Sequence, residues 1–134
     1  MPHLRAIALL SLVSCSSHAR VRNSIPESSQ GAVYDEKAVD QAVTPIDLPM
    51  PVYPPAPQIA GQCGHVDLRY VVGLDGRAEA GTIVAVYATN HEFEQAALDV
   101  IRAARFNAAR LAGKPVRQRV EQRIKFSVMG GGSC

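Results

Sequence analysis

The chain has 134 residues with 14 basic and 12 acidic side chains, which gives a formal net charge of +2. A net charge this close to zero excludes a nucleic-acid-binding protein that depends on counterion release. The longest strongly apolar stretch, residues 6–13, is much shorter than the roughly twenty residues that a membrane-spanning helix needs. A chain of this length forms one domain, so a large multi-domain enzyme is excluded as well.

The N-terminus has the features of an export signal, because Arg5 places a positive charge ahead of the apolar stretch. Residues 12–15, Leu-Val-Ser-Cys, resemble the lipobox of bacterial lipoproteins. That resemblance implies a signal peptide over residues 1–14 and lipidation of Cys15, which would anchor the chain in a membrane. Ser16 resembles the outer-membrane sorting pattern more than the retention signal. The alternative is an ordinary secretory signal in which Cys15 is incidental.

The next segment, residues 15–57, is predicted to be a disordered tether. Its first part mixes Ser, Gln, Asp and Glu with little periodicity. Six of the nine prolines then fall between Pro45 and Pro57. Because proline lacks an N–H donor and restricts φ, this part is expected to be extended, polyproline-like chain that joins neither a helix nor a central strand.

The remaining residues, 58–134, are predicted to form a folded ββαβ domain. Strands are indicated by apolar residues that alternate with polar ones, and the helix by apolar residues at helical spacing. The predicted elements are a strand over residues 66–72, a turn at Asp75-Gly76, a strand over 81–87, a helix after a capping box at Thr89, and a strand over 116–128.

These elements predict an α+β fold of two layers, in which one helix covers one face of a three-stranded antiparallel sheet of order 2-1-3. Cys63 and Cys134 are predicted to form a disulfide, because an exported chain meets an oxidising compartment. The order 2-1-3 permits this bridge without strain, since it brings the beginning of the first strand beside the end of the last.

Catalytic chemistry is not indicated. The histidines are His3, His18, His65 and His91. No two of them have the spacing of metal ligands, and no Ser or Cys nucleophile has an identifiable base. The sequence therefore predicts a protein that is not an enzyme, with no catalytic residue, metal site or cofactor.

Several short motifs follow one another in a specific order over residues 53–128. They are Tyr53-Pro54, Gly64-His65-Val66, Tyr70-Val71-Val72, Asp75-Gly76-Arg77, Ala96-Ala97-Leu98, Arg105-Phe106, Gly113-Lys114-Pro115-Val116 and Phe126. Their order and spacing resemble the C-terminal domain of the TonB family, which has the same ββαβ fold. Three departures from the family are Ala108 in place of a common proline, Met50 and Val52 where glutamine is frequent, and the absence of an N-terminal transmembrane helix.

The resemblance implies a periplasmic binding module that adds an extended peptide beside its last strand, by β-augmentation. The implied partner is an outer-membrane receptor or another envelope protein, in TonB-dependent transmembrane transport. The candidate edge is Arg117–Ser127. The predicted partner-binding residues are Arg117, Arg119, Glu121, Arg123, Lys125 and Tyr53.

Two alternatives stay open for this edge. Its four cations would favour an acidic partner, but charged side chains on an edge strand also serve to prevent edge-to-edge aggregation. The alternative function is a structural envelope lipoprotein that self-associates as a homodimer through the same edge, without energy transduction.

Overall fold

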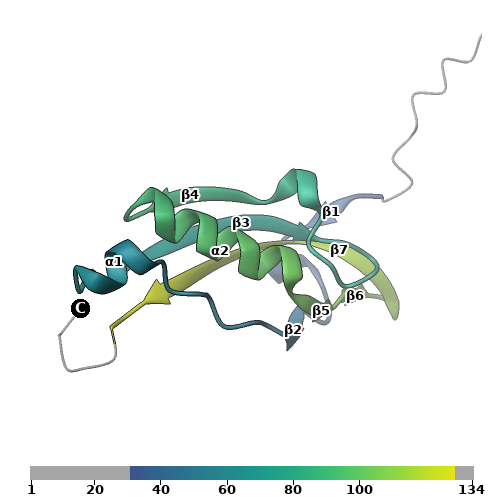
Figure 1. Ribbon diagram of the computed structural model, residues 1–134. Coiled ribbons are helices and arrows are strands. Elements are labelled where there is room, and N and C mark those ends of the chain that lie inside the picture. Colours follow the sequence, from purple (N-terminus) through teal and green to yellow (C-terminus); the bar gives the residue numbers. More distant parts are fainter. Residues whose placement is uncertain (1–30, 129–134) are drawn as a thin grey trace, which may run out of the picture.

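The structure, a computed structural model, describes residues 31–128 of the chain. It has a mixed α+β fold in which a curled sheet is covered on one face by a long helix, α2 (His91–Ala103) (Figure 1). The longest strands are β3 (Gly64–Val72), β4 (Val84–Ala88) and β7 (Lys114–Phe126). No helix in this part of the chain combines the length and the apolarity required to cross a membrane.

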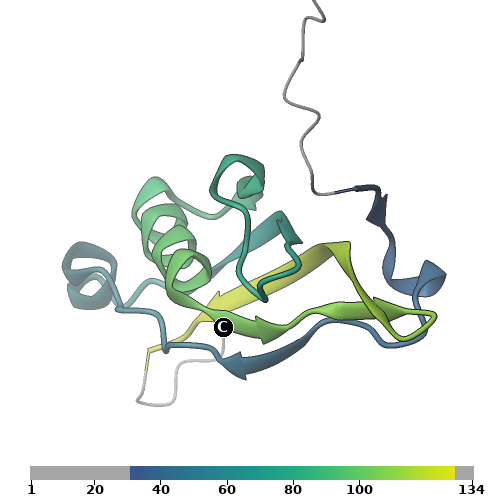
Figure 2. The same cartoon turned by 90° about the vertical axis from the view of Figure 1, so that its right-hand side faces the viewer.

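Short elements surround these strands and were not predicted from the sequence. They are β1 (Val33–Tyr34), β2 (Thr44–Asp47), β5 (Arg105–Asn107), β6 (Ala109–Leu111), the helix α1 (Pro55–Ile59), and the 3-10 turns η1 (Glu36–Ala38) and η2 (Ala80–Thr82). The main sheet has the order β1-β7-β3-β4, with β6 paired to the start of β7. β2 and β5 form a separate two-stranded sheet (Figure 2). The predictions of three strands and one helix are therefore wrong in number.

β3 and β7 form the centre of the sheet. They pair antiparallel from Gly64 beside Phe126 to Val72 beside Gln118. Along β7, Gln118, Ile124 and Phe126 are buried and Val120 and Gln122 are half-buried, whereas the alternate residues Arg119, Glu121, Arg123 and Lys125 are exposed. This alternation confirms the predicted face assignment of the last strand, and it places the charged row on the face opposite α2.

The core lies between α2 and the inner face of the sheet. Phe93 of α2 stacks on Phe126 of β7 with ring centroids 4.5 Å apart. Tyr70 of β3 is almost fully buried and donates a hydrogen bond of 2.7 Å to Oε1 of Gln122. Burial raises the pKa of Tyr70 to about 12, so the hydroxyl keeps its proton at neutral pH. The Phe93–Phe126 pair thus connects α2 to β7, and the Tyr70–Gln122 hydrogen bond connects β3 to β7.

The helix begins one residue later than a cap at Thr89 requires. Asn90 is the N-cap, and its side-chain oxygen accepts a hydrogen bond of 2.8 Å from the backbone N–H of Phe93. The Thr89 hydroxyl instead joins β4 to β3, because it accepts from the N–H of His65 at 2.9 Å and lies 3.2 Å from the His65 carbonyl oxygen, to which it donates. The predicted capping box at Thr89 is therefore wrong, because Asn90 caps the helix.

The predicted turn at Asp75-Gly76 lies between β3 and β4, where the N–H of Gly73 donates to the carbonyl of Arg77. Gly76 has φ +76°, a left-handed conformation that glycine adopts without strain. The returning strand starts only at Val84, because η2 intervenes. The prediction of a strand from residue 81 is therefore corrected at its start.

Residues 31–57 are not the disordered tether that the sequence predicted. The N-terminal arm, residues 31–41, pairs through β1 with β7 (Figure 2). Oδ2 of Asp40 in this arm accepts a hydrogen bond of 2.8 Å from the N–H of Ala112. Pro45 lies within β2, which has only one partner strand in the described chain, and proline is tolerated at such an edge. Short edge pairings of this kind leave no periodic pattern in the sequence. The predicted signal peptide and Cys15 lie outside the described residues.

Candidate binding edge

The edge of β7 that faces away from β3 is partly paired with another segment of the same chain. β1 pairs there in parallel, with Val33 beside Arg117 and Tyr34 beside Gln118. From Arg119 to Phe126, β7 pairs only with β3 within residues 31–128. We call these eight residues the open edge. The sequence predicted an edge over Arg117–Ser127, so the available edge is shorter than expected by its first two residues and by Ser127.

Arg117 is held inside the domain. Its Nε and one terminal nitrogen contact the two carboxylate oxygens of Glu79 at 2.9 and 2.8 Å. Its other terminal nitrogen donates to the carbonyl of Gly31 at 2.8 Å. The side chains of Arg117 and Glu79 are only 13% and 18% exposed. Arg117 therefore has a structural role in these contacts, in contrast to the predicted partner-binding role.

The other charged residues of the predicted face lie along the outer face of the open edge. Arg119 contacts Asp35 of the arm at 3.0 Å, and Glu121 contacts Arg69 of β3 at 3.1 Å. Lys125 has no ion pair with any described residue. The face is therefore not uniformly cationic, because neighbouring carboxylates and guanidinium groups alternate on it.

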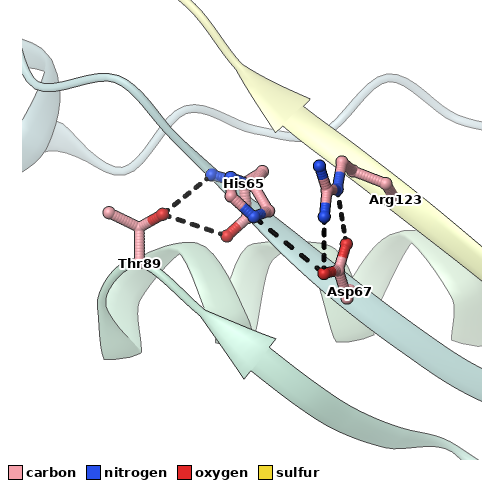
Figure 3. A network of polar contacts seen from close by, with 4 residues as sticks. All are labelled: His65, Asp67, Thr89 and Arg123. Atoms are coloured by element: carbon pink, nitrogen blue, oxygen red, sulfur yellow. Dashed lines mark hydrogen bonds and ion pairs between the residues drawn. The ribbon is translucent and has the colours of Figure 1, made fainter.

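Arg123 takes part in a polar network at the far end of the open edge (Figure 3). Its Nε and one terminal nitrogen donate to the carboxylate of Asp67 at 2.6 and 2.9 Å. These hydrogen bonds lower the pKa of the Asp67 carboxyl from its ordinary value. His65 lies 3.9 Å from the same carboxylate and stacks on Tyr87 of β4. The network joins three strands on the outer face.

Sequence reasoning missed Asp67 and Arg69 as partners of this row. Both point outward from β3, and the register sets Asp67 beside Arg123 and Arg69 beside Glu121. Their alternation with apolar residues was visible in the sequence. The register was not, because it depends on which residues of two distant strands face each other.

Tyr53 packs against the core close to the end of the open edge. Its ring meets Phe93 and Phe126 edge-on, with centroid distances of 5.5 and 5.9 Å, and its hydroxyl donates to the carbonyl of Gln62. The two nearby residues Met50 and Val52 are 89% and 81% exposed. Tyr53 thus anchors the proline-rich segment to the domain.

Cys63 precedes β3 by one residue, and Gly64 pairs with Phe126 near the end of β7. The chain therefore leaves β7 close to Cys63, as the predicted bridge requires. Cys134 lies outside the described residues, so the Cys63–Cys134 disulfide stays a prediction.

Two of the comparisons with known proteins gave a match, one to a family and one to a fold. Residues 49–128 match the model of the family described as Gram-negative bacterial TonB protein C-terminal. The fold is similar to the solution NMR structure of the Pseudomonas aeruginosa TonB CTD, with a TM-score of 0.60 and 20% sequence identity over 76% of this chain and 100% of that chain. No curated protein matches the sequence. Because the family match covers more than half of the 134 residues, the chain belongs to the TonB C-terminal family.

Proposed function

We propose that this protein is a non-enzymatic binding module of the cell envelope that adds an extended peptide to the open edge. The observation that carries the proposal is the run of eight residues, Arg119–Phe126, whose outer side pairs with no strand among residues 31–128. Unpaired N–H and C=O groups on a strand edge are a template for another strand. Main-chain hydrogen bonds then supply affinity, and side chains supply the choice of partner.

Membership of the TonB C-terminal family supports an envelope protein as the partner. We propose a peptide of an outer-membrane receptor, reached from the periplasm in TonB-dependent transport. Self-association through the same edge, as a homodimer, is the competing function, and the experiment below separates the two.

Photo-crosslinking in cells tests the proposed edge. A photo-reactive residue in place of Glu121, whose side chain is 69% exposed on the open edge, is expected to capture an envelope protein. The matched control replaces Asp99 of α2, which is 74% exposed but lies on the helix layer. Mass spectrometry identifies what is captured. Capture of a second copy of this chain favours the homodimer, and equal capture from both positions contradicts a role for the open edge.

We also propose that lipid on Cys15 holds the module at a membrane, with the outer membrane favoured by Ser16. Each buried methylene of an acyl chain contributes about 0.8 kcal/mol, so a multiply acylated cysteine is a firm anchor. Cys15→Ala is expected to abolish incorporation of labelled fatty acid and to move the protein from the membrane fraction to the soluble fraction. Unchanged labelling and fractionation of the variant would exclude this anchor.

A further inference from the structure

The charges that flank the open edge have a definite order of sign. Reading along β7 on the outer face, Arg119 is positive, Glu121 negative, and Arg123 and Lys125 positive. The side chains of Arg119, Glu121 and Arg123 are 49%, 69% and 52% exposed despite their ion pairs. Exposed pairs of this kind are weak, so each group still acts on a charge placed beside it by an added strand.

The N-terminal arm shows how a strand beside β7 can place an opposite charge next to one of these residues. β1 pairs Val33 with Arg117 and Tyr34 with Gln118, and the next residue, Asp35, contacts Arg119 at 3.0 Å. An acid of the arm therefore lies at the position beside the first cation of the open edge. Because Asp35 already occupies the position beside Arg119, the charges that remain for an incoming peptide are those of Glu121, Arg123 and Lys125.

On this basis we propose that the open edge selects a strand with a cation opposite Glu121 and acids opposite Arg123 and Lys125, an inference that rests on the proposed function. Opposite charges directly across two strands attract, and like charges in the same positions repel. The selected partner is thus an extended peptide of mixed charge, in contrast to the acidic partner that four cations in the sequence favoured. Positions between the charges face the inner side of the sheet, beside Val120, Gln122 and Ile124, and suit β-branched residues.

Three synthetic peptides test this order with the full chain. The first has capped ends and reads glutamate, valine, glutamate, valine, lysine, valine, threonine, which fits the charges when it runs antiparallel to β7. The second is the same sequence reversed, which fits when the peptide runs parallel. The third peptide is whichever of these two binds more tightly, with its lysine replaced by glutamate. Fluorescence anisotropy at low ionic strength measures the affinities, because salt screens exposed charges.

The variants are Glu121→Lys and, as control, Asp99→Lys, which changes the net charge by the same amount on α2. The chain as it stands is expected to bind the lysine peptide about three- to tenfold more tightly than its glutamate counterpart. Glu121→Lys should reverse this preference, while Asp99→Lys should preserve it.

The outcomes separate the two proposals. If no peptide binds, strand addition at the open edge is wrong and the inference falls with it. If the lysine and glutamate peptides bind equally, or if both variants change the preference alike, strand addition stands and the proposed order of charges is wrong.

Discussion

Gly76→Ala is expected to destabilise the domain by about 3 kcal/mol, because it combines backbone strain with a steric overlap. Gly76 has φ +76°, and a Cβ built there would overlap the carbonyl oxygen of Phe106. The two backbones cannot simply move apart, since the N–H of Phe106 donates to the carbonyl of Gly76 at 2.8 Å. The turn after β3 would have to separate from β5 to admit the methyl group.

Urea unfolding followed by circular dichroism measures this cost. Gly81→Ala is the matched control, because no atom beyond Gly81 and its two neighbours in the chain lies within 4 Å of the Cβ position there. Its free energy of unfolding should stay within about 0.5 kcal/mol of the parent, as for surface substitutions in general. Equal stabilities for the two variants would contradict the close approach of Gly76 and Phe106.

Arg117→Met is expected to cost about 3 kcal/mol, because it leaves the carboxylate of Glu79 in a poorly exposed position without its partner. Glu79 is 18% exposed and receives two hydrogen bonds from Arg117. The same substitution removes the hydrogen bond to the carbonyl of Gly31, so the start of the N-terminal arm should exchange its amide protons faster.

The control for this prediction is Arg119→Met, two residues along the same strand. Arg119 is 49% exposed and forms a single contact of 3.0 Å with Asp35, so its loss should cost less than about 1 kcal/mol. Adding Glu79→Leu to Arg117→Met should recover part of the lost stability, because the unpaired charge is then removed. A double variant less stable than Arg117→Met alone would contradict the explanation that the unpaired charge of Glu79 causes the loss of stability.

Local pattern was sufficient to predict the central elements of the fold. The alternation of residues 116–128 identified the inner and outer faces of β7 correctly, and the apolar stripe identified α2. The pairing of β1 with β7 could not be predicted from the sequence, because a strand of two residues has no measurable period and its partner lies far along the chain. The same reason explains the wrong prediction of a disordered tether at residues 31–57.

The candidate site was predictable as a row of residues but not as a set of interactions. Arg117 and Arg119 have the same charge and the same parity along β7, so nothing in the sequence separates them. Glu79, held by the chain between β3 and β4, distinguishes the two by pairing with Arg117 only. The register of β3 likewise decides that Asp67 pairs with Arg123. Tertiary placement therefore removes Arg117 from the exposed row and sets an opposite charge beside Arg119, Glu121 and Arg123.

The arm on β7 also limits the stretch of β7 with which a guest segment could pair. Eight residues of strand extend about 26 Å, from Arg119 to Phe126, at roughly 3.3 Å per residue. Beyond Arg119 the guest backbone would collide with β1, whose residues already take the next two positions. A longer guest must turn away into solvent at that point or displace Val33 and Tyr34. Under the proposed strand addition, β1 therefore limits how far a guest segment can pair along β7 at that end.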